Sequence, residues 1–419
     1  MTIKVHSTKS DRPKPSYGNR GIRKSWIPYS IGLALALVAL LALPSPAQAQ
    51  TYTENTIYSF PGGDGGIEPL FSGVVRDSEG NFYGTTYAGG PYNYGTVFKV
   101  DAAGNETVLH GFGQGHDGRT PYSGLVLDST GHLFGTTYGG GIRDRKCRNG
   151  CGIVFEIFPN GDEKILHGFG GVKGDGSLPI GNLIRDAAGN LYGTTQMGGT
   201  YGYGTVFKID GAGTETVLYN FGESLDGDYP AAGVIEDSAG NFYGTTSGGG
   251  ANSLGTVFKL DPSGHETLLH NFAGGSDGSA PMSGLVRDPS GNLYGTTYLG
   301  GTYGVGTVFE VDANGNETIL EAFGANNSGD YAESTLVRDS QGNLYGSTIQ
   351  GGANASGTEG GTVFKVSSQG AFSVLYGFAG EPNGAGPDGP LMIDSSGTLY
   401  GTTASGGTTN NGTVFQLTP

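Results

Sequence analysis

Short runs of alternating apolar and polar residues, separated by glycine-containing turns, follow one another along most of the chain. In one stretch, residues 284–288 lead through a Pro-Ser-Gly turn to residues 292–297. A glycine-rich loop then leads to residues 306–311, and an Asp-Ala-Asn-Gly turn leads to residues 317–323. Segments rich in Val, Thr, Tyr and Phe between such turns are typical of antiparallel hairpins. The pattern predicts four β-strands here, and residues 50–419 contain no segment with helical periodicity.

The same four-strand pattern recurs along the chain. Its most constant part is Tyr-Gly-Thr-Thr or a close variant, whose copies begin at Tyr83, Phe134, Tyr192, Tyr243, Tyr294, Tyr345 and Tyr400. Successive spacings are 51, 58, 51, 51, 51 and 55 residues, and a fixed period of this length indicates a repeat architecture.

The third predicted strand indicates which repeat architecture the chain adopts. It places Val and Phe side by side, as at Val308 and Phe309, so both faces of its sheet are apolar. Such a sheet fits a blade packed between two other blades, and four-stranded sheets repeated radially form a propeller. The sequence therefore predicts an all-β fold, a seven-bladed β-propeller of four-stranded antiparallel blades. An open β-solenoid is the alternative, although its coils are usually shorter and stack without hairpins.

The chain ends predict how the ring closes. The Phe-terminated fourth strand has an extra copy at residues 54–60, ahead of the first inner strand, and the last repeat lacks one. We take the Gly-Leu-Val-x-Asp segments as inner strands, which then start near residues 73, 124, 181, 233, 284, 335 and 390. Residues 54–60 would be the outer strand of the last blade, and this N-terminal strand would leave no sheet edge open.

Residues 1–49 have the features of a secretory signal peptide. A basic head precedes an apolar run at residues 31–43, and an Ala-x-Ala site ends at Ala49. The run is shorter than the roughly 20 residues that cross a membrane; an uncleaved anchor is the alternative. Cleavage near Ala49 would leave residues 50–419 as the mature propeller, without a membrane span, secreted, periplasmic or on the cell surface.

Removal of this leader makes the protein strongly acidic. The leader holds seven of the 22 basic and one of the 38 acidic residues, so residues 50–419 keep 15 and 37, a net charge of −22. Nucleic acids and anionic lipids are bound through Lys and Arg, so this charge argues against both as partners. We expect a monomer outside the cytoplasm.

The whole repeat resembles a known bacterial one. The pattern Gly-Leu-Val-x-Asp-x-x-Gly-Asn-Leu-Tyr-Gly-Thr-Thr, then Gly-Thr-Val-Phe-Lys-Val-Asp and Glu-Thr-Val-Leu-His-x-Phe, is similar to the GloVer repeat (the Gloeobacter–Verrucomicrobia type) of choice-of-anchor tandem repeat proteins. The resemblance covers residues 54–419. It implies an exported bacterial protein, secreted or on the cell surface, and implies no reaction. Relatives can carry a C-terminal sorting segment, and we expect none here because the chain stops at Pro419.

Two loops of each blade are expected to share one face of the propeller. The loop from an outer strand to the next inner strand carries an Asp-Gly pair, at Asp117, Asp175, Asp226 and Asp277. The loop between the second and third strands carries tyrosines, among them Tyr87, Tyr138, Tyr201 and Tyr298. We expect a ring of carboxylates near the channel mouth, with the tyrosines further out.

This arrangement would suit two kinds of ligand. Aromatic rings with carboxylates suit neutral sugars, and clustered carboxylates suit Ca²⁺, which takes roughly six to eight oxygen ligands. The alternative is structural, because Asp-Gly is a common turn pair and tyrosines can simply cover glycine-rich backbone.

The remaining polar residues form no recognisable catalytic or metal-binding set. His110, His167 and His270 share one outer-strand position that holds Tyr or Glu in other repeats, which favours a half-exposed strand residue over a metal ligand or a general base. The Asp-x-x-Gly-Asn segments lack the alternating oxygen ligands of an EF-hand loop and are expected to be turns. We find no Ser-His-Asp order with an activating motif and no zinc spacing.

Two long loops break the regularity of the repeats. One contains Cys147 and Cys151, the only cysteines, and in an exported protein we expect a disulfide that closes the loop tip. Their Cys-x₃-Cys spacing argues against a redox role. The same loop carries the basic run 142–146, which we expect to contact a protein partner. The second long loop, residues 353–360, is expected to border the same channel mouth.

The sequence therefore favours a non-catalytic binding protein with a carbohydrate or a cell-surface protein as partner, and with no cofactor unless Ca²⁺ is bound. The alternative is a propeller enzyme, a hydrolase or lyase on a polysaccharide or lactone, using channel-mouth carboxylates and Ca²⁺. A structural coat protein is a third reading. An enzyme would need one asymmetric cluster, and the sequence shows asymmetry only in the two long loops.

Overall fold

The computed structural model describes residues 52–143, 147–222, 225–353 and 360–419. The expected signal peptide lies outside the described residues, as do residues 144–146 of the basic run and 354–359 of the second long loop. The chain divides into two units, and the one described here is Ala49–Pro419. Within the described residues the regular elements are strands and two 3₁₀ turns, η1 (Gly63–Gly65) and η2 (Gly275–Asp277). No helix in this part of the chain is long and apolar enough to cross a membrane.

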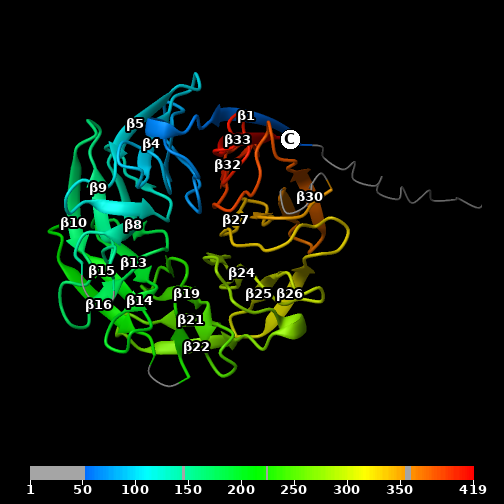
Figure 1. Ribbon diagram of the computed structural model, residues 1–419. Coiled ribbons are helices and arrows are strands. Elements are labelled where there is room, and N and C mark those ends of the chain that lie inside the picture. The colour runs from blue at the N-terminus through cyan, green and yellow to red at the C-terminus, as the bar shows by residue number, and fades with distance from the viewer. Residues whose placement is uncertain (1–51, 144–146, 223–224, 354–359) are drawn as a thin grey trace, which may run out of the picture. The chain divides into compact units, whose positions relative to one another are not determined.

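Seven antiparallel sheets stand around a central axis, so this unit is the predicted seven-bladed β-propeller (Figure 1). Each blade has four strands in sequence order from the axis outwards, except that the last blade takes its outer strand from the N-terminus. We number the blades 1 to 7 from the first complete one, β2 to β5.

The inner strands are β2 (Val75–Arg76), β7 (Val126–Leu127), β12 (Ile184–Arg185), β18 (Ile235–Glu236), β23 (Val286–Arg287), β27 (Val337–Arg338) and β31 (Met392–Ile393). The second strands are β3 (Phe82–Thr86), β8 (Leu133–Gly140), β13 (Leu191–Thr195), β19 (Phe242–Thr246), β24 (Leu293–Thr297), β28 (Leu344–Thr348) and β32 (Leu399–Thr403).

The third strands are β4 (Thr96–Val100), β9 (Ile153–Ile157), β15 (Thr205–Ile209), β21 (Thr256–Leu260), β25 (Thr307–Val311), β29 (Thr362–Val366) and β33 (Thr413–Thr418). The outer strands are β5 (Glu106–Gly111), β10 (Glu163–Gly168), β16 (Glu215–Asn220), β22 (Glu266–Asn271), β26 (Glu317–Ala322), β30 (Phe372–Gly377) and β1 (Thr53–Ser59). Short accessory pairs are β6 (Gly118–Pro121) with β8, β11 (Gly176–Ser177) with β14 (Met197–Gly198), and β17 (Gly227–Asp228) with β20 (Gly248–Gly249).

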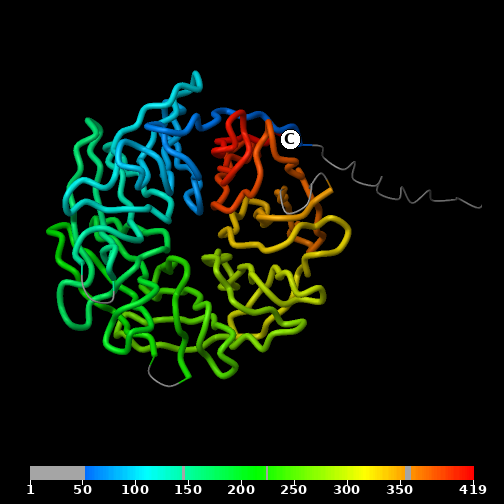
Figure 2. The backbone as a smooth tube through the Cα atoms, in the orientation of Figure 1, coloured from blue at the N-terminus to red at the C-terminus, as the bar shows by residue number. Residues whose placement is uncertain are grey.

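The N-terminal strand closes the ring as predicted. β1 pairs antiparallel with β33, from Thr53 opposite Thr418 to Ser59 opposite Thr413. The two ends of the propeller therefore lie side by side in blade 7 (Figure 2). Phe60, directly after β1, is fully buried, and its ring centroid lies 5.0 Å from that of Phe98 in blade 1.

The inner strands are shorter than predicted. Each pairs over two residues and begins two or three residues after the expected start, as at Val75–Arg76. The preceding segments converge near the axis, where a Cβ on Gly124 would lie 2.4 Å from the carbonyl oxygen of Ser72. A Cβ on Gly233 would lie 2.0 Å from the carbonyl oxygen of Asn182. At Gly124 and Gly233 the neighbouring backbone therefore approaches too closely for a side chain, and only glycine fits there.

The apolar core lies between the blades. The Phe that follows each outer strand packs against the Phe of the third strand in the next blade, at centroid distances of 5.0 to 5.2 Å. The seven pairs are Phe60–Phe98, Phe112–Phe155, Phe169–Phe207, Phe221–Phe258, Phe272–Phe309, Phe323–Phe364 and Phe378–Phe415. All fourteen rings are fully buried. The paired Val and Phe of the third strand thus cover both faces of the blade, as the sequence indicates.

The Tyr-Gly half of the Tyr-Gly-Thr-Thr motif makes contacts within its own blade, and its tyrosine also packs against the next blade, as Tyr400 does against Phe82 at 5.1 Å. The hydroxyl of Tyr83 donates to Asp77 at 2.9 Å, which ties the second strand to the turn that follows the inner strand. A Cβ on Gly84 would lie 2.6 Å from the ring of Phe98, so this glycine leaves room for the core Phe. Asp77 also accepts the N–H groups of Glu79 and Asn81 at 2.9 Å, which identifies the Asp-x-x-Gly-Asn segment as a turn.

The two threonines connect strands and blades. Thr85 donates to the carbonyl oxygen of Ser123 in the next blade at 3.0 Å. Thr86 lies 2.9 Å, hydroxyl to hydroxyl, from Thr96 in the adjacent strand. All three hydroxyl-bearing side chains are buried, so these bonds satisfy groups that would otherwise be costly to bury.

We expect Phe60→Ala to lower the free energy of unfolding by about 3–5 kcal/mol, because it removes a buried ring where the chain ends meet. A chain that starts at Gly62 lacks all of β1 and should lose more. Denaturant titrations measure both, with Asn55→Ala, an exposed change in the same strand, as the control. Equal stability of the shortened and complete chains would show that β1 does not hold the ring closed.

Candidate functional site

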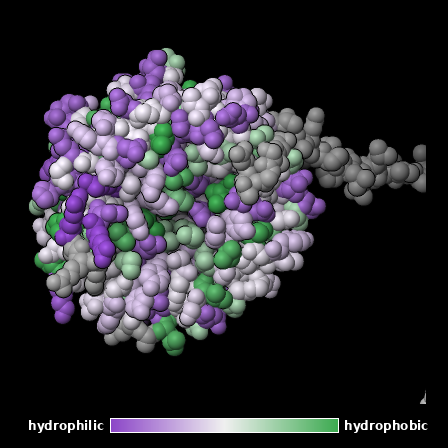
Figure 3. Space-filling view, in the orientation of Figure 1, coloured by the Kyte–Doolittle hydropathy of each residue, from purple (hydrophilic) through white to green (hydrophobic). Residues whose placement is uncertain are grey.

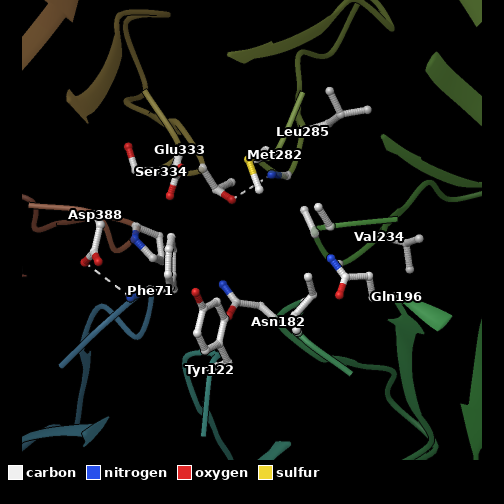
Figure 4. Close-up of a pocket in the computed structure, with 18 of the residues that line it drawn as sticks. Phe71, Tyr122, Asn182, Gln196, Val234, Met282, Leu285, Glu333, Ser334 and Asp388 are labelled. Carbon is white, nitrogen blue, oxygen red and sulfur yellow. Dashed lines mark hydrogen bonds between the residues drawn. The ribbon is translucent and has the colours of Figure 1, made fainter. Parts of the chain in front are cut away.

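Seven equivalent residues converge on the axis. Each stands six positions before the aspartate that follows an inner strand, and together they are Phe71, Tyr122, Ile180, Ala231, Met282, Glu333 and Asp388. We call them the channel ring. All seven line one cavity of about 520 Å³ (Figure 4). The space-filling view shows a hollow at the middle of the propeller with apolar residues beside it (Figure 3).

The channel ring is chemically asymmetric. Blades 3 to 5 contribute Ile, Ala and Met, whereas blades 6 and 7 contribute Glu333 and Asp388, and blades 1 and 2 contribute Phe71 and Tyr122. The two aromatic rings stack with centroids 4.5 Å apart. One arc of the ring therefore carries two acids next to two aromatic side chains, and the other arc is apolar.

Asp388 holds Phe71 in place. The first repeat has one additional residue, Leu70, ahead of Phe71, and Phe71 adopts a left-handed φ of +55°. This conformation is unfavourable for a bulky side chain. The N–H of Phe71 donates to Oδ1 of Asp388 at 3.2 Å, and only 4% of Asp388 is exposed. The acid of blade 7 thus anchors the aromatic side of the cavity.

Burial raises the pKa of both acids. The pKa of Asp388 rises to about 8, mainly through loss of hydration and further through the charge of Glu333. Loss of hydration raises the pKa of Glu333 to about 7. Burial and the charges of these two acids also raise the pKa of Tyr122. The cavity can therefore lose two protons near neutral pH and become strongly negative.

The tyrosines predicted as site residues divide between two places. Tyr87 and Tyr138 line the cavity, with ring centroids 5.7 and 5.9 Å from that of Tyr122. Tyr298 packs on Tyr331 at 5.0 Å. Tyr201 is outside the cavity lining and 44% exposed.

The aspartates predicted as a carboxylate ring lie away from the cavity, against the outer strands. Asp117 accepts the N–H of Gly113 at 2.9 Å and lies 3.2 Å from Nε2 of His110. Asp226 likewise accepts from the hydroxyl of Tyr219, at 2.9 Å. Asp175 and Asp277 contact outer-strand histidines in the same way. The Asp-Gly pair follows the outer strand after only a few residues, so the aspartate side chain lies against that strand and not at the cavity. None of the four aspartates lines the cavity as predicted, whereas Tyr87 and Tyr138 do.

The outer-strand histidines reach across blade junctions, which the sequence did not indicate. Each lies 3.1 to 3.4 Å from its aspartate and 3.7 to 3.8 Å from the first glutamate of the next outer strand. The three sets are His110–Asp117–Glu163, His167–Asp175–Glu215 and His270–Asp277–Glu317. We call them the junction triads. In each triad the imidazole nitrogen and the carboxylate oxygens lie within 4.8 Å of one another. Such atoms can act as ligands of divalent transition metals.

At a fourth blade junction a tyrosine stands in the place of the histidine. There the hydroxyl of Tyr219 donates to Asp226 at 2.9 Å and lies 3.4 Å from Glu266. Because tyrosine serves in the same place, a polar contact with the glutamate of the next blade is present whether or not the residue is a histidine.

The channel ring is the feature that sequence reasoning missed. Its signal is a repeat position occupied by seven different residues, Phe, Tyr, Ile, Ala, Met, Glu and Asp, between nearly constant neighbours. Comparison of the repeats position by position would have found it. The disulfide between Cys147 and Cys151 is present as predicted.

Fold and cavity define a seven-bladed propeller with an asymmetric small-molecule-sized cavity at its axis. The chain belongs to the repeat family described as the Gloeobacter/Verrucomicrobia repeat, which matches residues 45–237, 142–359 and 233–419. The resemblance read from the repeat is thereby confirmed. No curated protein matches the chain in sequence.

Solved structures share the fold at low sequence identity. Two are extracellular domains of BT4673 from B. thetaiotaomicron, assigned to a one-component and to a hybrid two-component system. Their TM-scores are 0.55 and 0.57, with 11% and 12% identity over 88% of this chain. This chain spans only 40% and 39% of their length. XC5397 from Xanthomonas campestris, described as a gluconolactonase, reaches a TM-score of only 0.41, with 14% identity over 88% of this chain and 89% of its own.

We expect Asp117→Ala to destabilise the protein by about 1–3 kcal/mol, because it leaves the N–H of Gly113 and the His110 ring without their acceptor. His110→Tyr, which copies the native residue of the Tyr219 junction, should change stability by less than about 1 kcal/mol. Urea denaturation compares the two variants. A loss as large for His110→Tyr as for Asp117→Ala would mean that the imidazole has a role tyrosine cannot fill, such as holding a metal.

Stability should fall as the pH rises from about 5 to about 9. Glu163, Glu317, Glu333 and Asp388 have pKa values raised to about 8, 9, 7 and 8 by burial, so they stay protonated in the folded chain after the unfolded chain has lost its protons. Unfolding free energies at a series of pH values test this. Asp388→Asn, which stays neutral, should flatten the decline; profiles parallel to that of the parent would contradict the assignment.

Proposed function

We propose that the protein is an exported, non-catalytic binding protein that holds a carbohydrate in the axial cavity. The cavity itself supports the proposal most strongly. Its volume of about 520 Å³ falls within the roughly 300–1,000 Å³ of small-molecule sites, and it joins apolar and aromatic walls to a few polar groups.

The lining offers what a sugar needs. The stacked rings of Phe71 and Tyr122 present aromatic surface for the C–H face of a sugar ring. Asn182 and Gln196 bring amide groups to the same cavity for sugar hydroxyls. Of the tyrosines first proposed as ligand contacts, Tyr87 and Tyr138 keep this role.

Export is part of the proposal. The disulfide supports a location outside the cytoplasm, and solved structures with the same fold are extracellular domains. Cleavage near Ala49 would release residues 50–419 there, as a monomer in this proposal. A cell-surface protein is the second partner class. It is favoured by exposed apolar side chains on loops that connect the same pairs of strands as the cavity loops, including Tyr92, Leu225 and Tyr303.

A hydrolase or lyase acting on a polysaccharide or lactone is the alternative. One observation favours it: two carboxyl groups with raised pKa values, Glu333 and Asp388, share the cavity. Such groups serve general acid catalysis, and they, rather than the Asp-Gly aspartates, would be the carboxylates beside a bound Ca²⁺.

A panel of soluble glycans, each with and without Ca²⁺, tests the proposal through the melting temperature, because a ligand that binds only the folded state must raise it. We expect a glycan-dependent rise without Ca²⁺. Tyr122→Ala should weaken binding about tenfold, close to 1.4 kcal/mol, and Tyr201→Ala, outside the cavity, should not.

Other outcomes separate the alternatives. A rise that needs Ca²⁺ and is lost when Asp117, Asp175 and Asp226 are all changed to Ala would favour a calcium site at the outer strands. Cleavage of a glycan would favour the enzyme. No rise with any glycan would contradict carbohydrate binding and leave a protein partner.

A further inference from the structure

The two acids of the channel ring occupy positions where the fold accepts apolar side chains. The equivalent residues in blades 4 and 5 are Ala231 and Met282, in loops of the same form. Asp388 anchors Phe71, but Glu333 has no such structural role: among the described residues its carboxylate has no hydrogen-bond or ion-pair partner. A partly buried carboxylate without a partner costs stability, so its presence points to something that binds it.

The cavity contains no charge to balance these acids. Its lining includes no Lys, Arg or His, although Glu333 and Asp388 are close enough to influence each other's ionisation. A cationic ligand would supply the positive charge that the lining lacks and would favour the ionised form of both acids. The net charge of the chain, −16, would favour the approach of such a ligand.

Aromatic faces stand beside the acids. Tyr122 lies within the field of both carboxylates, and the rings of Phe71, Tyr87 and Tyr138 surround it at 4.5, 5.7 and 5.9 Å between centroids. A cation within about 6 Å of an aromatic centroid is attracted by the ring, and more strongly where water is excluded.

We infer that the ligand carries an ammonium group, as a sugar with a free amine does, held by Glu333 and Asp388 against the rings of Phe71 and Tyr122. The carboxylates accept charge-assisted hydrogen bonds from the ammonium, and the rings contact its remaining face. This inference rests on the carbohydrate binding proposed above and names the class of sugar.

The test compares two tetrasaccharides that differ only in N-acetylation, a glucosamine tetramer and an N-acetylglucosamine tetramer, by calorimetric titration of the purified protein near neutral pH. We expect the glucosamine tetramer to bind at least about tenfold more tightly. The double variant Glu333→Gln, Asp388→Asn should abolish this difference and keep the affinity for the acetylated tetramer.

Matched variants separate charge from folding. Glu333→Met copies the residue of blade 5 at the same position, so it should fold and lose most of the preference. Asp330→Asn removes a half-buried acid of the same loop outside the cavity lining, and should keep it. A preference that survives in the double variant overturns the role assigned to the acids.

The remaining outcomes distinguish this inference from the proposed function. Equal or tighter binding of the acetylated tetramer overturns the ammonium site and leaves carbohydrate binding standing. Binding of tetramethylammonium without binding of any glycan keeps a cation site and overturns the carbohydrate function. No binding of either tetramer or of tetramethylammonium overturns both.

Discussion

The packing of one phenylalanine on another across each blade junction is the interaction on which the rest of the structure depends. It occurs at all seven junctions with nearly the same spacing, so each blade is fixed to the next in the same way. The glycine of Tyr-Gly-Thr-Thr exists because a side chain there would strike the third-strand ring, as Gly84 would strike Phe98. The same packing explains why β1 closes the last blade, since without Phe60 the junction between blades 7 and 1 would lack one of its two rings.

Polar contacts add a second connection at the same junctions. Threonines such as Thr85 reach the carbonyl groups of the next blade, and the junction triads join outer strands. The triads show how a repeat tolerates change when a contact is kept: His270 and Tyr219 differ in chemistry, yet both bind the aspartate of their own loop. Residues that look like a histidine–carboxylate site are thereby explained as part of the scaffold.

A scaffold held at its junctions leaves the axial ends of the loops free to vary. Seven equivalent residues meet there, and their identities differ without disturbing strand pairing. Two acids on blades 6 and 7 lie beside two aromatic rings on blades 1 and 2. They make one side of the cavity chemically different from the other, although the blades themselves repeat. The chemical asymmetry of the cavity therefore resides in one repeat position, and the hydrogen bond from Phe71 to Asp388 joins its acidic and aromatic parts.

The sequence by itself determined the fold, because apolar periodicity, turn residues and a fixed repeat length are local properties that recur in every copy. It also determined the closing strand and the disulfide, from the extra copy at residues 54–60 and from the spacing of Cys147 and Cys151. Only the tertiary structure decided the site. Glu333 and Asp388 stand 55 residues apart and share one cavity because the loops of consecutive blades converge on the axis, whereas Asp117 and its equivalents, the more conspicuous acids in the sequence, contact their own outer strands. The distance of a side chain from the propeller axis depends on how its loop is folded, and a local sequence pattern does not predict that distance.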